Sequence, residues 1–394
     1  MEKQYRVKRI VEKLQEFEKE NKMNMKIAMA PGRINLIGEH TDYNEGFVFP
    51  CAVSKENIMA AIPNRSKMIR VYSLNYNDSL QFSINDLNLT GTWIDYIKGV
   101  VFYLKEAGYE INGITGVLHS NIPIGGGLSS SAALEVVSAY IFKSLYDLDI
   151  NYKDLALICY KAERIFMNIS CGIMDQFISA LGKKNCFLFL DCRPPYNFEH
   201  IELPRDDVKM VIMDTKIHHA ASKVLNIRRE ECFKGVEIIR EKTGLDISSL
   251  RDISIDQFEE VKNFLPQLIR NRCEHVIYEN QRVLKSKEAI RKGDFELLGN
   301  LMYTSHSSLD TLYEVTCKEL NSMVEITKNI DGVIGARMTG AGLGGCACCI
   351  CYDWATNEVI NKTKKEYEKE YGIEPEIYSC NISDGARELK SIEN

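Results

Sequence analysis

A short polar segment near the N-terminus has the composition of a sugar-binding site. Residues 30–46 read APGRINLIGEHTDYNEG and place Glu39, His40 and Asp42 together between glycines. Carboxylate and imidazole groups this close in sequence can accept and donate hydrogen bonds to several hydroxyl groups at once, as sugar recognition requires. The alternative is a solvent-exposed turn, and this segment alone does not decide between the two.

A glycine-rich loop followed by serines indicates an anion-binding site. Residues 121–135 read NIPIGGGLSSSAALE and lie between an apolar, strand-like run and an apolar helix that we expect to begin near residues 129–131. The first N–H groups of a helix are unpaired and attract anions, and glycines let the backbone approach a phosphate closely. The alternative is a glycine-rich turn with a serine cap. The loop matches neither the Walker A nor the dinucleotide-binding pattern.

Two carboxylates further along the chain are candidates for metal binding and for base catalysis. Glu163 falls on the apolar face of a helix predicted after Asn151, and a carboxylate directed towards a core needs a partner such as a divalent cation. Asp175 follows a glycine turn and opens the next predicted helix. At that position it is either a functional group or a helix cap.

Both helices and strands must position these segments. The spacing of apolar residues predicts a helix over 5–20, and β-branched runs predict strands at 26–30, 47–53, 58–62 and 69–73. Turn-forming residues at 189–197 indicate a boundary between two lobes, and a second glycine-rich segment follows at 335–345. The predicted fold class is therefore mixed α and β, without internal repeats.

Charge and hydropathy narrow the class of protein. The chain of 394 residues carries a net charge of −6, which argues against a nucleic-acid-binding surface. Its N-terminus is charged throughout, and no run approaches the ~18 apolar residues of a membrane span. We therefore expect a cytoplasmic protein that binds neither nucleic acid nor membrane.

The cysteine pattern favours reduced, buried thiols. There are 13 cysteines, and one cluster gathers Cys346, Cys348, Cys349 and Cys351 in GGCACCICYD. A strand sends alternate side chains to opposite faces, so these four thiols cannot surround one tetrahedral zinc ion. A buried strand is the preferred interpretation, and a metal site is the alternative.

Seven segments taken together resemble the GHMP kinases, named for galactokinase, homoserine kinase, mevalonate kinase and phosphomevalonate kinase. They read GRINLIGEHTDY, DYIKGV, GGGLSSSAA, CGIMDQF, LDCR, SHSSLDTLYEVTCKEL and GARMTGAGLGGC, and within the family the chain is most similar to the galactokinases. The resemblance implies an α/β (α+β) fold of two lobes, the first like domain 2 of ribosomal protein S5 and the second ferredoxin-like. We place these lobes at residues 1–197 and 198–394.

The resemblance also implies an activity and roles for individual residues. The expected reaction is transfer of a phosphoryl group from ATP, with Mg²⁺, to the anomeric hydroxyl of galactose. Asp175 would be the base facing Arg33, and Ser131 and Glu163 would hold the magnesium ion. Sugar contacts are expected at Glu39, His40, Thr41, Asp42, Gly172 and Gly340. ATP contacts are expected at Ser73, Trp93, Gly125, Gly126, Gly127, Leu128, Ser129, Ser130 and Ser131.

Three departures from the family pattern leave the sugar open. Leu225 stands where galactokinases usually have a tyrosine beside the sugar, Asn168 replaces a usual glycine, and Leu343 replaces a common phenylalanine. One lost contact is worth about 1–3 kcal/mol of discrimination, so a related aldose such as an amino- or deoxy-galactose, or a broad range of aldoses, is the alternative to galactose. Leu225 could instead lie outside the sugar site. A non-catalytic sugar sensor is a further alternative, and the sequence does not predict the oligomeric state.

Overall fold

The first lobe is built on a six-stranded sheet. The computed structural model describes residues 2–17, 24–64, 66–123, 126–217 and 221–389. In sheet order the strands are β13 (Arg387–Glu388), β1 (Lys26–Asn35), β3 (Pro50–Pro63), β6 (Ile114–Ser120), β4 (Met68–Ser73) and β5 (Asp78–Ser83). The β4–β6 pair is parallel and the other neighbours are antiparallel. The residues of β1 from Ile27 to Asn35 are all buried, because helices cover both faces of the sheet.

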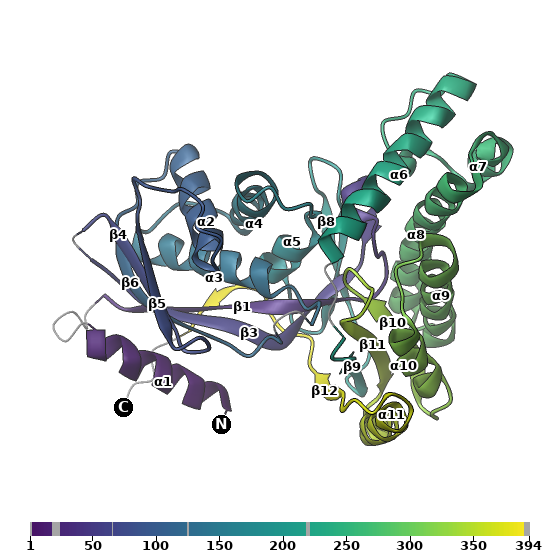
Figure 1. Ribbon diagram of the computed structural model, residues 1–394. Coiled ribbons are helices and arrows are strands. Elements are labelled where there is room, and N and C mark those ends of the chain that lie inside the picture. Colours follow the sequence, from purple (N-terminus) through teal and green to yellow (C-terminus); the bar gives the residue numbers. More distant parts are fainter. Residues whose placement is uncertain (1, 18–23, 65, 124–125, 218–220, 390–394) are drawn as a thin grey trace.

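Helices cover both faces of this sheet, and alternate side chains of β1 point towards one face or the other. Ala28 and Ala30 point into a core formed with α2 (Ile94–Glu106), α3 (Ser130–Leu145), α4 (Tyr152–Lys161) and α5 (Met174–Leu181). Ile27 and Met29 point to the opposite face and pack against α1 (Glu2–Phe17). Figure 1 shows α1 alone below the sheet, with α2–α5 above it.

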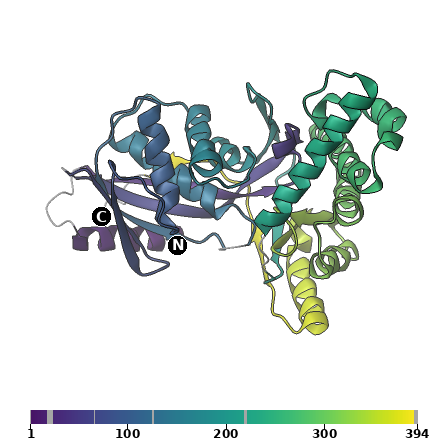
Figure 2. The same ribbon diagram turned by 45° about the horizontal axis from the view of Figure 1, so that its top comes forward.

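The second lobe is an antiparallel sheet in the order β10 (Val333–Thr339), β11 (Cys346–Tyr352), β9 (Val208–Asp214) and β12 (Glu376–Cys380). Its helices lie at the opposite end of the molecule from α1–α4 (Figure 2). They are α6 (Ala221–Thr243), α7 (Ile255–Val261), α8 (Gln267–Lys292), α9 (Phe295–Ser308), α10 (Lys318–Lys328) and α11 (Thr356–Tyr371).

The cysteine cluster forms the buried strand that the sequence favoured. Cys346 and Cys348 of β11 pack into one core, whereas Cys349 and Cys351 pack into another core on the opposite face. All four thiols are buried and free. Burial raises the pKa of Cys346 well above its usual value, so this thiol stays protonated.

A small sheet joins the two lobes. It pairs β2 (Phe47–Val48) with β7 (Cys186–Asp191) and β7 with β8 (Phe198–Glu202). The predicted division after residue 197 falls in the β7–β8 hairpin, and β13 at the end of the chain pairs with β1. The division therefore stays a prediction. Among the described helices, none is long and apolar enough to span a bilayer.

The strand predicted over 47–53 is corrected. Phe47 and Val48 belong to β2, whereas residues from Pro50 onward belong to β3, which continues through 58–62 to Pro63. The break falls at Phe49, whose N–H donates to the carbonyl oxygen of Ile37 at 3.1 Å and to Oδ1 of Asn35 at 3.3 Å. The chain therefore changes sheets inside a continuous apolar run, FVFPCAV, that gives no sign of a break.

Candidate active site

An ion pair between the buried Arg33 and the partly exposed Asp175 joins strand β1 to the first turn of α5. Nε of Arg33 donates to Oδ1 of Asp175 at 2.9 Å, and its Nη2 donates to Oδ2 at 3.0 Å. Burial acts to lower the pKa of Arg33, but Asp175 and Glu39 outweigh it, so the pKa is raised. Two parallel hydrogen bonds fix the carboxylate in one orientation. The structure thus brings together the two predicted catalytic residues.

The glycine-rich loop folds back over this pair. The Arg33 guanidinium donates to the carbonyl oxygen of Gly127, and the hydroxyl of Ser129 donates to the Asp175 carboxylate. Ser129 has a φ of 60° and precedes the first residue of α3, so the chain turns sharply into the helix. The N-terminus of α3 therefore opens towards Asp175. The predicted contact at Gly125 lies outside the described residues, whereas Gly126 to Ser131 lie within them.

The two predicted magnesium ligands meet beside the start of α3. Ser131 Oγ donates to Oε1 of Glu163 at 3.0 Å, and Gln176 Nε2 donates to Oε2 at 2.6 Å. Burial, and then the charge of Asp175, raise the pKa of Glu163. Mg²⁺ is usually bound by one or two protein oxygens together with substrate phosphates, so this oxygen pair fits such an ion. Within the described residues, no three His, Cys, Asp or Glu side chains are grouped to hold a metal by themselves.

A cavity of about 500 Å³ opens in front of the α3 N-terminus, and we call it the nucleotide cavity. Arg33, Asp175, the loop from Gly127 to Ser131 and Ser73 line it. At its far end the rings of Tyr76 and Trp93 lie nearly parallel, with centroids 6.4 Å apart and an interplanar angle of 16°. Both rings line the cavity, so a flat ligand ring can stack on an aromatic face there.

A smaller cavity of about 120 Å³, the sugar cavity, shares Arg33 and Asp175 with the nucleotide cavity. The predicted sugar contacts that line it are Glu39, His40, Asp42, Gly172 and Gly340, and Leu225 lines it as well. The hydroxyl of Thr41 instead donates to the carbonyl oxygens of Gly38 at 2.9 Å and Phe47 at 2.6 Å. Its sugar contact therefore stays a prediction.

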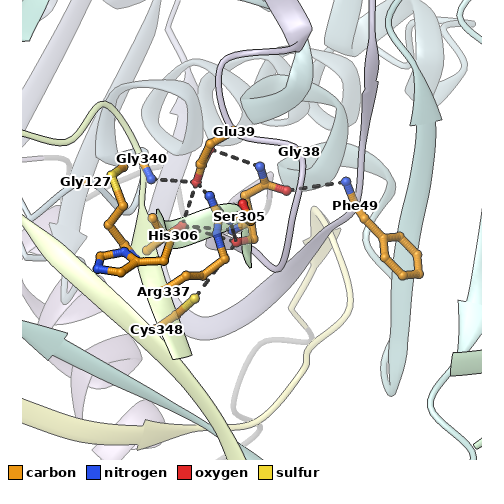
Figure 3. Close-up of polar contacts among 12 residues, drawn as sticks. Gly38, Glu39, Phe49, Gly127, Ser305, His306, Arg337, Gly340 and Cys348 are labelled. Carbon is orange, nitrogen blue, oxygen red and sulfur yellow. Dashed lines mark hydrogen bonds and ion pairs between the residues drawn. The ribbon is translucent and has the colours of Figure 1, made fainter. Parts of the chain in front are cut away.

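Glu39 is held from both lobes. Its Oε1 accepts hydrogen bonds from Gly340 N at 2.8 Å and Thr339 Oγ1 at 3.1 Å, and its Oε2 accepts from Asn35 Nδ2 at 3.0 Å. Arg337 lies behind this carboxylate, 3.7 Å from Oε1, and donates to the carbonyl oxygen of Asn35 at 3.1 Å (Figure 3). The carboxylate therefore links the sugar-binding segment to the end of β10.

His40 lines the sugar cavity, and one of its ring nitrogens has no hydrogen-bond partner among the described residues. Its Nδ1 is hydrogen-bonded to the Tyr43 hydroxyl at 2.8 Å, and that hydroxyl lies 3.0 Å from the Tyr313 hydroxyl. Nε2 is buried and has no hydrogen-bond partner within the described part of the chain. Burial, His275 and Arg337 lower the pKa of His40 well below its usual value, so the ring is neutral. The hydrogen-bonding capacity of Nε2 is therefore unused within the described part of the chain.

Asp42 and Gly172 form the tightest contact of the sugar cavity. A Cβ atom added at Gly172 would lie 1.8 Å from Oδ2 of Asp42, so only glycine leaves room for this carboxylate. Burial and the charge of Asp175 raise the pKa of Asp42 to about 7. Of the three carboxylates that line the cavity, Asp175 is paired with Arg33, whereas Asp42 is only partly ionised near neutral pH.

The sequence missed several residues of the site. Tyr76 lies in a turn between β4 and β5, and only the fold brings it opposite Trp93. Arg337 sits in an apolar strand pattern that gives no sign of a charge at the sugar cavity. Gln176, between Glu163 and Glu135, follows directly after Asp175 in the CGIMDQF segment, and this position was the only available signal.

Three family models match this chain. The model of the GHMP kinases N terminal domain matches residues 95–183, and that of the GHMP kinases C terminal matches residues 286–369. The model of the galactokinase galactose-binding signature matches residues 15–63, which include the segment with Glu39, His40 and Asp42.

Curated relatives and solved structures are similar over nearly the whole chain. The galactokinase of Clostridium beijerinckii is 40% identical over 370 residues, covering 92% of this chain and 94% of the relative. The galactokinase of Thermosipho africanus is 39% identical over 362 residues, covering 92% of this chain and 99% of the relative. The crystal structure of Lactococcus lactis galactokinase complexed with galactose superposes with a TM-score of 0.91 at 32% identity, covering 96% and 98%. Methanococcus jannaschii mevalonate kinase, at a TM-score of 0.65 and 19% identity, shares the fold.

Proposed function

Because this chain belongs to the GHMP kinase family, we propose that it is a galactokinase, which transfers the γ-phosphoryl group of ATP to the anomeric hydroxyl of galactose. The products are galactose 1-phosphate and ADP. One observation carries the proposal: the Arg33–Asp175 pair lines both the nucleotide cavity and the sugar cavity. A group at that position touches the donor and the acceptor of the phosphoryl group.

Asp175 orients the acceptor and takes its proton. The bidentate contact with Arg33 and the hydrogen bond from Ser129 hold the carboxylate at the wall between the cavities. The anomeric hydroxyl donates to this carboxylate and is thereby aimed at the γ-phosphorus. Phosphoryl transfer passes through a loose transition state, so this positioning supplies much of the acceleration. The positive charge of Arg33 further stabilises the transferred group.

The phosphates bind at the N-terminus of α3. The unpaired N–H groups of this helix and the hydroxyls of Ser129, Ser130 and Ser131 face the nucleotide cavity. A magnesium ion held by Ser131 and Glu163 would neutralise charge on the phosphates. The adenine ring would stack on the aromatic face offered by Tyr76 or Trp93, with Ser73 beside it.

Glu39, His40 and Asp42 supply acceptors and donors for the sugar hydroxyls. All three residues line the sugar cavity, and this shared position supports the role. Leu225 lines the same cavity, so the alternative of a related aldose is kept. The cytoplasmic location expected from the sequence stays a prediction.

The test is ADP release by the purified protein with ATP, magnesium and a panel of aldoses. We expect turnover with galactose, and we expect Asp175→Ala to abolish it while ATP affinity, measured by calorimetry, changes little. The reason is that the carboxylate acts on the acceptor hydroxyl. Turnover that survives in Asp175→Ala would contradict the role of this residue. Galactose binding without any turnover in the unmodified protein would favour the sensor.

A further inference from the structure

A third cavity adjoins the sugar cavity. This outer cavity has a volume of about 770 Å³ and shares Tyr43 and Ser170 with the sugar cavity. It shares no lining residue with the nucleotide cavity among the described residues. The three cavities therefore lie in series, with the sugar cavity in the middle.

This order fixes which side of a bound sugar faces the outer cavity. The hydroxyl that reacts must lie against Asp175, on the side shared with the nucleotide cavity. The opposite side of the sugar ring, distal to the anomeric carbon, then faces Tyr43 and Ser170. A substituent on that side would enter the outer cavity without disturbing the reacting groups.

The lining of the outer cavity suits a neutral ligand with many hydroxyl groups. Its charged side chains are three basic and three acidic ones, Arg164, Arg229, Lys234, Glu45, Glu230 and Glu237. This balance gives no net charge to attract a polyanion, but it offers donors and acceptors in equal measure.

An aromatic ring and amide groups complete this lining. The Phe233 ring is 60% exposed on α6, and the side chains of Asn168 and Asn226 lie in the same cavity. An exposed aromatic face beside hydrogen-bonding groups matches a sugar ring, which has an apolar C–H face and a polar rim. The volume leaves room for such a ring.

Two departures from the galactokinase pattern fall on this path. Leu225 lines the sugar cavity, and the next residue, Asn226, lines the outer cavity, so α6 forms a wall of both. Asn168, in place of the usual glycine, lines the outer cavity. The aliphatic side chain of Leu225 has no hydroxyl to be left unpaired by a substituted sugar, so it rejects such a sugar weakly.

We infer that the outer cavity is a second sugar subsite. The protein then phosphorylates disaccharides whose reducing-end sugar is galactose and whose second sugar is attached to that galactose on the side away from the anomeric carbon. The inference rests on the proposed function. The reducing-end anomeric oxygen forms a bond to the γ-phosphorus of ATP as the bond from that phosphorus to the β–γ bridging oxygen breaks. ADP leaves with the electron pair, and the hydroxyl proton passes to Asp175.

The experiment compares kcat/KM for galactose with that for galactosyl-galactoses linked at the 3, 4 or 6 position of the reducing end. ADP release gives the rate, and mass spectrometry identifies the phosphorylated disaccharide. We expect at least one disaccharide to reach a kcat/KM within about tenfold of galactose. The corresponding methyl glycoside, which has no free anomeric hydroxyl, should give no product.

Substitutions separate the outer subsite from general effects. Phe233→Ala and Leu225→Tyr should each lower the ratio of kcat/KM for the disaccharide to kcat/KM for galactose by about tenfold. Phe233→Ala removes the aromatic contact in the outer cavity, and Leu225→Tyr narrows the space between the sugar cavity and the outer cavity. Phe264→Ala, which removes another exposed ring that lines neither cavity, should leave the ratio unchanged.

The possible outcomes distinguish failure of the outer subsite from failure of the proposed function. Galactose turnover without turnover of any disaccharide, or a ratio unmoved by both substitutions, would overturn the outer subsite and leave the proposed function intact. Disaccharide turnover without galactose turnover would support the subsite and overturn galactose as the substrate. If the protein turns over neither galactose nor any disaccharide, both the proposed function and the outer subsite are overturned.

Discussion

The Asp42 carboxylate is held under conditions that oppose its ionisation. Burial and the charge of Asp175 raise its pKa to about 7, and the backbone of Gly172 closes over it. An unfolded aspartate has a pKa of about 3.9, so the folded state binds this proton more tightly than the unfolded state does. The free energy of unfolding therefore decreases as the pH rises from about 4 to 7 because of this group. Ionisation of Asp42 therefore costs stability.

We therefore predict that Asp42→Asn stabilises the ligand-free protein at pH 8. The gain in Tm should shrink as the pH falls towards 4, because the wild-type carboxyl is then protonated as well. Thermal unfolding at several pH values measures this, with the exposed Asp206→Asn as a control for the same change in net charge. The same Asp42→Asn variant should raise KM for galactose. A Tm difference that does not vary with pH would contradict the prediction.

Arg337 is a positioning residue in the same region, because it acts on the sugar through Glu39. It is fully buried, and its Nε and Nη2 have no hydrogen-bond partner within the described residues. Its guanidinium is the buried positive charge behind the Glu39 carboxylate, at 3.7 Å. Removing one member of a buried ion pair leaves the other charge uncompensated, which costs about 3–5 kcal/mol.

We predict that Arg337→Met lowers the free energy of unfolding by about 3 kcal/mol and raises KM for galactose more than KM for ATP. Urea denaturation and steady-state kinetics measure the two effects. Arg337→Lys, which keeps the charge, should recover part of the galactose affinity. Equal changes in both KM values would mean that Arg337 supports the fold without orienting Glu39.

The sequence could predict the site residues that act through their own chemistry. The composition around Arg33, Ser131, Glu163 and Asp175 left a purely structural interpretation open, and their roles followed from the resemblance to the GHMP kinases. The structure brings Arg33 to Asp175 and Ser131 to Glu163. Residues that act through another residue carry no such signal. Arg337 occupies an apolar strand, and only the packing of the two lobes brings it to Glu39.

At the scale of elements, helix α9 lies directly against strand β10. A Cβ atom added at Gly299 of α9 would lie 1.8 Å from the carbonyl oxygen of Ile334. Alanine is normally favoured over glycine inside a helix by about 0.5–1 kcal/mol. Here the close approach of the two backbones reverses the sign, because β10 must move for a methyl group to fit.

We predict that Gly299→Ala lowers the free energy of unfolding by about 3 kcal/mol, as overpacking of a well-packed interface does. Gly372→Ala is the matched control. Gly372 has a φ of 68° after α11, with open space around it, so only the conformational cost of about 1 kcal/mol applies. Denaturant unfolding of both variants measures the difference. An equal loss in both would show that the α9–β10 contact relaxes easily.

The sequence could predict whether a segment forms a helix or a strand where the hydrophobic pattern is local. It could not predict the residues at which these elements begin and end. The helix expected over 5–20 is α1, which begins at Glu2, and the helix expected from residues 129–131 is α3. The departure at Asn168 also has a local reason: its φ is 54°, and asparagine tolerates this left-handed conformation better than most residues. The split of residues 47–53 between two sheets depends on partners distant in sequence, so no local pattern predicts it.

At the scale of the whole molecule, the end of the chain returns to the first lobe and supports the catalytic helix. After β12, Ser383 N donates to the carbonyl oxygen of Ala52 at 2.9 Å. Gly385 N then donates to the carbonyl oxygen of Gly182 at 2.7 Å, and Ala386 N to that of Ser179 at 2.8 Å. These last two contacts fix the C-terminal end of α5, whose first turn carries Asp175.

We predict that a chain ending at Cys380 is less stable and slower than the full chain. The cut removes these three backbone hydrogen bonds, two more (Ser54 N to the carbonyl oxygen of Asn381 and Leu389 N to that of Ile27), and the pairing of β13 with β1. At about 1 kcal/mol for each of the five bonds, the free energy of unfolding should fall by at least about 5 kcal/mol. A shift of α5 would move Asp175, and misplacement of a reacting group by about 1 Å can cost a factor of about 100, so kcat should fall at least tenfold. KM for ATP should change little, because the N-terminus of α3 is untouched.

The control is a chain ending at Leu389, which keeps β13 and all three contacts and should match the full protein. Urea denaturation and ADP release are measured on both truncated chains at a temperature where each is folded. If the shorter chain loses stability but keeps the full kcat, the returning segment holds the sheet and does not position Asp175. In that case Ser179 Oγ, which donates to the carbonyl oxygen of Pro31 at 2.7 Å, is enough to fix α5 against β1.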